Sequence, residues 1–156
     1  MRSCVAWLSC LILLFLASGC AIPPEKLMQR ELKTPDYLAA EALDAQWRAQ
    51  GVISNLLAKE TADAEGNRLI ALRSLTLPLN DPLGAQQAAV EALAAFAAKG
   101  QRPMSLIVSV KTPIQQQQLG MWIKQGAIAS GGQNSVMLDN RRGPANNLQV
   151  SAQYQP

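Results

Sequence analysis

The sequence contains no histidine and only 4% aromatic residues. Without histidine, the chain excludes Ser-His-Asp and Cys-His catalysis, histidine-ligated metal sites and histidine-based pH switches. The scarcity of aromatic side chains argues against a stacking platform for single-stranded nucleic acid, and the formal net charge of +3 is too small to indicate nucleic-acid binding. What is present is a chain of 156 residues with 49% hydrophobic composition, which is room for one domain with a tail.

The first twenty residues differ in composition from the rest of the chain. Arg2 is their only charged residue, and an apolar run follows from Val5 to Ala17. The run is shorter than the roughly 20 residues that span a bilayer, so the basic start and the short apolar core predict a secretory signal peptide. Its end resembles the lipobox of bacterial lipoproteins and reads Leu16-Ala17-Ser18-Gly19-Cys20.

The lipobox resemblance implies cleavage before Cys20, a thioether-linked lipid on its sulfur, and a fatty acyl chain such as palmitate on the new amino terminus. An ordinary signal peptide or a short membrane anchor is the alternative. Cleavage removes Cys4 and Cys10, so residues 20–156 carry no thiol for a disulfide or a nucleophile. Cys20 is followed by Ala21 and not by the aspartate that favours inner-membrane retention, which implies a lipid anchor on the periplasmic face of the outer membrane.

Composition divides the chain into four parts. We expect residues 1–19 to be the signal peptide, and residues 20–33, with Pro23-Pro24 and mixed charges, to be a lipidated cysteine and tether. Residues 34–66 are predicted to form an N-terminal helical segment. Residues 67–156 are predicted to form an α/β sandwich domain.

The helical segment has a recognisable start at Thr34-Pro35-Asp36. Threonine suits the N-cap, proline suits the first turn, and Asp36 complements the positive end of the helix dipole. Apolar spacing predicts that this helix covers residues 37–50. Residues 52–57 fit either another helical turn or a short strand.

Alternation of apolar residues predicts the strands of the sandwich domain. In the first strand, Ile70 and Leu72 are expected on one face with Arg68. In the last strand, apolar residues alternate with polar ones, so one face of the sheet should be packed and the other open and polar. The opposite face of the first strand is expected to carry Leu69, Ala71, Leu75, Leu77 and Leu79. The predicted strands cover residues 68–79, 104–110, 135–139 and 147–154, with loops or turns over 126–133 and 140–144.

Two helices are expected to connect these strands. The first covers residues 81–99, begins with Asp81 as cap and Pro82 in the first turn, and ends at Gly100 with a positive φ. The second covers residues 114–125. The order β-α-β-α-β-β with right-handed crossovers predicts both helices on one face of a mixed sheet, which is an α/β (α+β) two-layer sandwich preceded by the N-terminal helix.

The sequence offers no assembled set of catalytic groups. Ser105 and Ser109 lie in a predicted strand, with Lys111 nearby but no histidine to activate them. Most carboxylates fall in the first helix or in loops, so the carboxylate pair of glycoside hydrolysis is poorly supplied. Neither a calcium loop nor a glycine-rich phosphate loop is recognisable. We therefore expect a protein that is not an enzyme and uses no cofactor or metal.

Two polar clusters are candidate contacts for a partner. Gln115 and Gln116 begin a run of four glutamines, which fits either a hydrogen-bonding patch for a protein or cell-wall glycan or a solvated face of good helix formers. Arg141 and Arg142 fit either a contact with an anionic partner or a solvated hairpin end.

Residues 67–154 resemble the CpaD-type lipoproteins of Flp/Tad pilus assembly. The resemblance is carried by the strand Arg68–Leu79, the alanine-rich helix Gln87–Phe96, the apolar strand Ser105–Val110 and the alternating strand Leu148–Tyr154. It implies an outer-membrane lipoprotein that supports the secretin channel through which the pilus leaves. It brings no catalytic residues.

The order of elements is also similar to that of OmpA-type peptidoglycan-binding domains. Those domains hold the peptide stem with an aspartate after the second strand and an arginine on the next helix, whereas the corresponding run Lys111–Gln118 has neither. The functional hypothesis is an outer-membrane-anchored periplasmic lipoprotein that assembles or stabilises a secretin or Flp/Tad-type pilus machine. A peptidoglycan-associated lipoprotein that links outer membrane and cell wall is the alternative.

Overall fold

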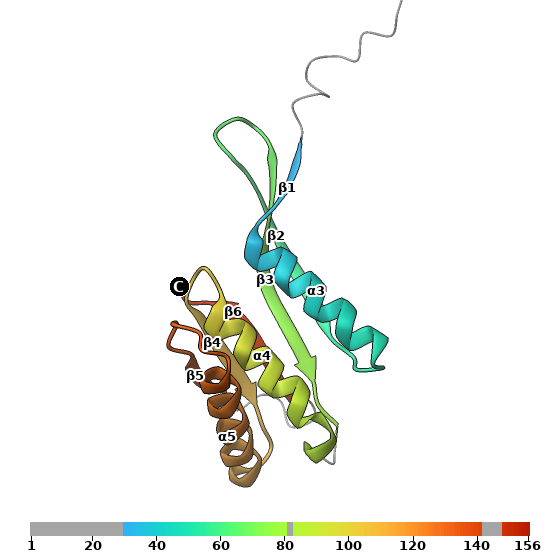
Figure 1. The fold of residues 1–156 in the computed structure, drawn as a ribbon, viewed down its shortest axis with the longest axis vertical. Helices are drawn as coiled ribbons and strands as arrows, with labels where there is room; N and C mark the ends of the chain where they lie inside the picture. The colour runs from blue at the N-terminus through green and yellow to red at the C-terminus, as the bar shows by residue number, and fades with distance from the viewer. Residues whose placement is uncertain (1–29, 81–82, 142–147) are drawn as a thin grey trace, which may run out of the picture.

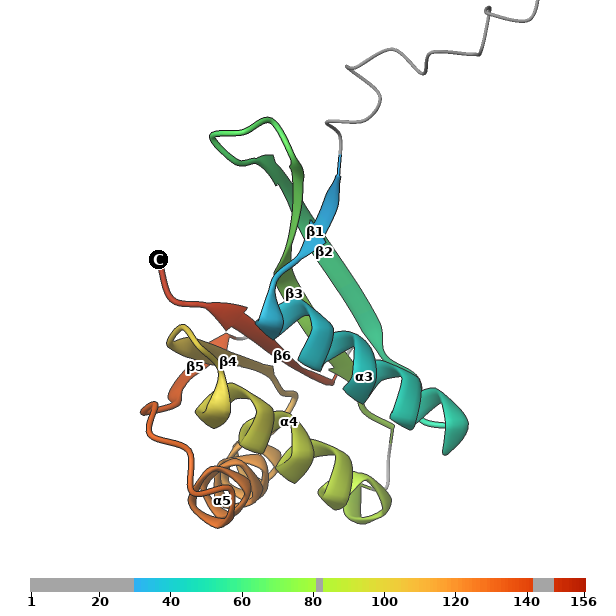
Figure 2. The same cartoon turned by 45° about the horizontal axis from the view of Figure 1, so that its top comes forward.

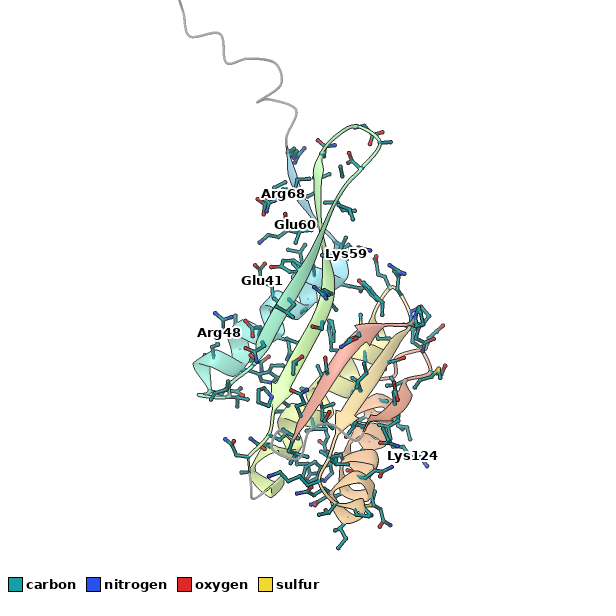
Figure 3. The ribbon with its side chains drawn as sticks, turned by 180° about the vertical axis from the view of Figure 1, so that it is seen from behind. Glu41, Arg48, Lys59, Glu60, Arg68 and Lys124 are labelled. Atoms are coloured by element: carbon teal, nitrogen blue, oxygen red, sulfur yellow. The ribbon has the colours of Figure 1, made fainter. Side chains whose placement is uncertain are left out.

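The computed structural model describes residues 30–80, 83–141 and 148–156. Within them, a mixed six-stranded sheet is covered on one face by three α-helices (Figures 1 and 3). The predicted α/β two-layer sandwich is therefore confirmed. In chain order the elements are β1 (Glu31–Lys33), α3 (Pro35–Ala49), β2 (Asn55–Ala62), β3 (Arg68–Pro78), the 3₁₀-helix η1 (Leu83–Gln86), α4 (Gln87–Lys99), β4 (Met104–Ser109), α5 (Pro113–Ala129), β5 (Met137–Arg141) and β6 (Gln149–Tyr154).

Strand β3 organises the sheet because it has partners along both edges. It pairs with β2 in antiparallel fashion over most of its length. Its other edge is shared by β1, which runs parallel to its start, and β6, which runs antiparallel to its end. From β3 the sheet continues through β6 and β4 to β5.

The two crossovers agree with the expected handedness. Strands β3 and β4 are both antiparallel to β6, so they are parallel to each other, and β4 is parallel to β5. Because α4 and α5 connect parallel strands and advance in the same direction across the sheet, the right-handed rule places both helices on one face. Figure 2 shows α4 and α5 over one part of the sheet and α3 over the β2–β3 part.

The core lies between the sheet and this helix layer. Apolar residues from both layers are completely buried, as the sequence periodicity predicted for β4 and β6. Burial of an aliphatic side chain contributes about 1.5–3 kcal/mol to the free energy of unfolding. The side chains with 0% exposure include Leu75, Val90, Leu93, Leu106, Val108, Leu119 and Val150.

Strand β3 contains a β-bulge at Arg73. Leu57 of β2 pairs with Ser74 of β3, and the next residue of β2, Ala58, pairs with Leu72. Arg73 is therefore the extra residue between two neighbouring pairs. The extra residue shifts the alternation of side chains by one position. Even-numbered residues of β3 therefore point to one face before the bulge and to the other face after it.

The bulge overturns the faces expected for the first half of β3. Ile70 and Leu72, which are 7% and 1% exposed, lie on the helix-covered face with Leu75. Leu69 and Ala71 are half-buried on the opposite face, although the simple alternation predicted them together with Leu75. The prediction was wrong because a period of two assumes a regular strand, and nothing in the residue types marks the bulge.

The predicted N-terminal helix is present as α3. Thr34 is its N-cap, and its Oγ1 accepts a 3.3 Å hydrogen bond from the Tyr37 N–H. The helix ends before Gly51, whose φ of +74° interrupts it. Of the expected helical segment 34–66, only α3 is helical, because β2 pairs along β3 instead, and the sheet thus crosses the expected boundary at residue 67.

Two glycines behave differently from the expectation. Gly100 follows α4 with a φ of −55°, so it is not a left-handed cap. Gly126 does not begin a loop but lies inside α5, where a Cβ would overlap the backbone of Glu91 in α4. The lack of a side chain thus lets the two helices approach closely. The expected cap at Asp81 and Pro82 lies outside the described residues.

The last two strands begin two residues later than predicted. β5 starts at Met137, and it takes up Asn140 and Arg141, which were expected in a turn. The rest of that turn, from Arg142 on, lies outside the described residues. β6 starts at Gln149, and its residues Val150 and Ala152 are buried as predicted, whereas Ser151, which was expected on the wet face, is buried as well.

The first described residue, Arg30, lies at the hairpin end of the molecule. The Arg68 N–H donates a 3.1 Å hydrogen bond to the Arg30 carbonyl, next to the turn that joins β2 to β3. In that turn Asp63 Oδ1 accepts hydrogen bonds from the N–H groups of Glu65 and Asn67 at 3.1 and 2.7 Å. Figure 1 shows the β2–β3 hairpin extending past the helices beside β1.

Candidate functional site: the open face of the sheet

The sheet face opposite the helices is organised in rows that the strand register defines. Directly opposed residues in neighbouring strands point to the same face. Four successive pairings therefore align one residue from each of five strands, and the next row lies two residues further along. The first row is Leu57, Ser74, Gln153, Ser105 and Met137, and the second is Asn55, Thr76, Ser151, Ile107 and Asp139.

These two rows form a surface of mostly polar groups, and the first row has an apolar residue at each end. Of the ten residues, Asp139 alone carries a charge. Ser74 and Ser151 are only 5% exposed, since larger neighbours flank them. Leu57 and Met137, at the two ends of the first row, are 53% and 59% exposed. We call these ten residues the open-face rows.

Hydrogen bonds between side chains hold the centre of the open-face rows. The Thr76 hydroxyl donates to the Ser151 hydroxyl across the β3–β6 pair at 2.9 Å. The Gln153 amide donates to the same Ser151 oxygen at 3.4 Å. These contacts satisfy the polar groups locally, so the centre of the face can lose its water at lower cost than free hydroxyl groups could.

A shallow cavity of about 670 Å³ lies at one end of the rows. Its floor combines apolar and polar side chains from β4 and β5, and the end of the chain forms part of its wall. Pockets of this size with mixed lining are typical of binding sites for a peptide segment or a small molecule. The lining residues are Ser105, Ile107, Met137, Leu138, Asp139, Gln153, Tyr154, Gln155 and Pro156.

The last strand is fixed to the first helix by a buried carboxylate. Asp36 is 5% exposed. Its Oδ1 accepts a 2.8 Å hydrogen bond from the Gln101 N–H, and its Oδ2 accepts a 2.9 Å bond from the Tyr154 hydroxyl. The guanidinium of Arg102 lies over the Tyr154 ring, 4.4 Å from its centre. This cluster positions the end of β6 beside the cavity.

The environment of Tyr154 favours its neutral form. Burial raises the pKa of this phenol, and the hydrogen bond to Asp36 raises it further, because ionisation would place two negative charges together. The nearby Arg102 lowers the pKa by a smaller amount. The phenol is therefore a permanent donor at neutral pH.

The structure gives the predicted glutamines roles inside α5. The Oε1 of Gln115 accepts hydrogen bonds from the N–H groups of Lys111 and Thr112 at 3.1 and 3.2 Å. Its own N–H donates to Thr112 Oγ1, which completes a capping box. Gln116 is half-buried in the first turn of the helix. Neither glutamine lies in the open-face rows.

The other predicted site residues are placed only in part. Arg141 is the last residue of β5 and pairs with Ser109. Arg142 and the predicted lipidation site Cys20 lie outside the described residues. The open-face rows themselves were predicted only as a polar face, because their composition depends on register across strands that are far apart in the sequence.

No three of the histidine, cysteine, aspartate and glutamate side chains in the described ranges gather where they could hold a metal ion. From residue 30 onward, in the part of the chain that the structure describes, no helix combines the length and apolar composition that crossing a membrane requires.

The chain was also compared with known proteins. No family model, no curated protein sequence and no solved structure matches it.

Proposed function

We propose that this protein is a lipid-anchored periplasmic factor of the outer membrane that binds a partner protein through its open-face rows. The partner is a secretin or another subunit of a Flp/Tad-type pilus machine, and the role is assembly or stabilisation without catalysis. The observation that carries the proposal is the open face, a nearly uncharged five-strand surface with exposed Leu57 and Met137 at its ends.

The size of the open face suits one side of a protein interface. The two open-face rows cross five strands about 4.8 Å apart and take up about four residues of each strand at a rise of about 3.4 Å, which gives roughly 330 Å² of flat area. A standard interface buries about 800 Å² per partner, so the rows supply the centre of such an interface and neighbouring residues supply the rest. A surface poor in charge is what the desolvated centre of an interface requires.

The point of chain entry supports docking beside a membrane neighbour. Arg30 lies at the hairpin end of the molecule, and the ten Cα-to-Cα steps between Cys20 and Arg30 reach at most about 35 Å. With Cys20 lipidated, the anchor joins the described domain at its hairpin end, and we infer that this end lies nearest the bilayer. The strands follow the long axis of the molecule (Figure 1), so the open face stands upright and meets a partner held in the same membrane.

The proposal is tested by placing charge on the open face. The double variant Leu57→Glu/Met137→Glu changes two exposed side chains, so the fold should persist while docking is lost. The matched control is Leu38→Glu/Ile128→Glu, whose side chains are 49% and 70% exposed on the helix side. Two unpaired charges in an interface should reduce co-purified secretin at least about tenfold in the first variant alone.

Two outcomes would contradict the proposal. One is a deletion strain that still forms secretin multimers and pili. The other is unchanged co-purification of the secretin with the open-face variant. Retention of the purified protein on isolated sacculi, with secretin assembly unaffected, would instead favour the peptidoglycan-associated alternative.

A further inference from the structure

A second cavity, of about 350 Å³, lies along one edge of β3. It is found between the part of that edge that pairs with β1 and the part that pairs with β6. Residues 71–73 of β3 have no strand partner on that edge, and the start of α3 fills the gap from the helix side. We call this cavity the gap pocket. It is lined by Thr34, Pro35, Asp36, Lys59, Thr61, Leu69, Ala71, Gln101, Arg102 and Tyr154.

Two cations of the gap pocket have no carboxylate partner among the described residues. All ion pairs that the structure gives involve three other cations, Lys33, Arg48 and Arg68. Among the residues that the structure describes, Lys59 makes no side-chain hydrogen bond or ion pair, and the one side-chain interaction given for Arg102 is with Tyr154. Figure 3 shows Lys59 on the hairpin strand, apart from the pair formed by Glu60 and Arg68.

The pocket also contains one carboxylate, that of Asp36, against its two cations. Each oxygen of Asp36 already accepts a hydrogen bond, from Gln101 and from Tyr154. Asp36 also lies in the first turn of α3, where the helix dipole partly offsets its charge. Two cations against one carboxylate leave the lining of the gap pocket with an excess of positive charge.

The donors of the gap pocket come from different sides. Lys59 and Thr61 project from β2, Thr34 stands at the start of α3, and Arg102 lies on the α4–β4 loop. Stacking on Tyr154 holds the guanidinium of Arg102 in one place and leaves its N–H groups available. A tetrahedral anion with several oxygens satisfies such a divergent set better than a planar carboxylate does.

We propose that the gap pocket binds a phosphate group, with Lys59 and Arg102 as the charged ligands and Thr61 as a hydroxyl donor. The phosphate is that of a phospholipid headgroup or the free ion. The volume exceeds that of about ten waters at about 30 Å³ each, so a phosphate with its attached alcohol fits. The site does not depend on the proposed docking of a secretin, because it uses none of the open-face rows.

Titration of the purified, detergent-solubilised full chain with inorganic phosphate, followed by calorimetry and ³¹P NMR, tests the site. We expect saturable binding in the millimolar range, and binding at least about tenfold weaker in Lys59→Ala/Arg102→Lys, since hydrogen bonds to charged groups are the strong ones. Lys124→Ala is the matched control, because Lys124 is an exposed cation on α5 far from the pocket (Figure 3). The single variant Lys59→Ala removes a side chain that makes no hydrogen bond or ion pair among the described residues, so its effect on phosphate binding does not come from the loss of such a structural contact.

A parallel experiment identifies the source of the phosphate. Co-flotation with vesicles of phosphatidylglycerol, against vesicles of phosphatidylcholine at equal salt, uses the same variants without residues 1–20, so that neither the lipid anchor nor the apolar leader binds the vesicles. If the protein floats with the vesicles and Lys59→Ala/Arg102→Lys abolishes flotation, the ligand is a phospholipid headgroup. If the protein binds phosphate but does not float, the ligand is the free ion. Absence of saturable phosphate binding, equal affinity for acetate and phosphate, or an equal loss in Lys124→Ala would overturn the proposal.

Discussion

The Tyr154 hydroxyl donates a 2.9 Å hydrogen bond to Asp36, a residue 118 positions earlier in the chain. The bond joins the last strand to the first helix, and Gln101 from the middle of the chain donates to the same carboxylate. Three segments far apart in sequence thus meet at one buried charge. A carboxylate so placed depends on both donors, because an uncompensated charge at 5% exposure is costly.

Removal of the Tyr154 hydroxyl should destabilise the protein. Tyr154→Phe leaves Asp36 with one donor, and we expect the free energy of unfolding to fall by about 1–3 kcal/mol. Urea denaturation followed by circular dichroism measures the difference. Tyr37→Phe is the matched control, since the structure gives the Tyr37 hydroxyl no hydrogen bond among the described residues. An equal loss in both variants would contradict the role of the Asp36 contact.

The same contact predicts a dependence of stability on alkaline pH. The pKa of Tyr154 is raised in the folded protein above the value of about 10 in the unfolded chain. The unfolded chain therefore loses its phenolic proton first, and the contribution of Tyr154 is complete below pH 10 and declines as pH rises above it. We expect the stability difference between wild type and Tyr154→Phe to shrink from about pH 9 to about pH 11. A difference that is constant over that range would exclude this linkage.

Two glycines of α5 should respond to alanine with opposite sign. Gly126→Ala places a methyl group against the Glu91 backbone, so we expect a loss of about 1–3 kcal/mol in the free energy of unfolding. Beyond the adjoining backbone of α5, no atom lies within 4 Å of the place that a methyl group would take at Gly120, and Gly120→Ala should stabilise the protein by up to about 1 kcal/mol through helix propensity. Thermal melts of the two variants compare the same chemical change in one helix. A destabilised Gly120→Ala would show that this part of α5 is packed more tightly than described.

Deletion of Arg73 should be far more damaging than its substitution. Arg73→Ala keeps the bulge and should change stability by less than about 0.5 kcal/mol, as for an exposed side chain. Deletion forces regular pairing, which turns Ile70 and Leu72 out of the core or slips the register with β2. Hydrogen exchange should then show loss of protection in β1, β2 and the first half of β3. Retained protection there would mean that the sheet tolerates the shift.

The lipid anchor gives a separate prediction. Cys20→Ala should block acylation, so the protein should leave the outer-membrane fraction or stay unprocessed. Metabolic labelling with a palmitate analogue and membrane fractionation measure the two effects. Ser18→Ala is the matched control, because it keeps a small residue before the cysteine. Unchanged labelling of the Cys20 variant would exclude the lipoprotein.

Local signals predicted most of the fold. The cap at Thr34, the alternation in β4 and β6 and the order of strands and helices led to the correct two-layer class, because each depends on neighbours in sequence. The β-bulge at Arg73 and the strand β2 could not be predicted in this way. The residues of β2 do not alternate between buried and exposed, since seven of the eight are exposed. The strand is held in place by pairing along the edge of β3.

The candidate site depends even more on distant contacts. Ser74, Gln153 and Ser105 are unremarkable one by one, and only the register brings them into a row. Lys59 and Arg102 were not candidates at all, since 43 residues of sequence and three elements separate them. Whether a charged side chain has a partner depends on the folded chain, so it cannot be predicted from neighbouring residues in the sequence.

The parallel pairing of β1 with the start of β3 has a mechanical consequence. A pull on the chain ahead of Arg30, directed away from the hairpin end, acts along the axis of β1 and not across it. The hydrogen bonds between Glu31–Lys33 and β3 then resist together in shear, and cannot be peeled apart one after another. Thr34, whose N–H donates to the Ile70 carbonyl at 3.0 Å, extends the same ladder to the N-cap of α3. Tension on a membrane tether would thus be passed directly into the central strand of the sheet.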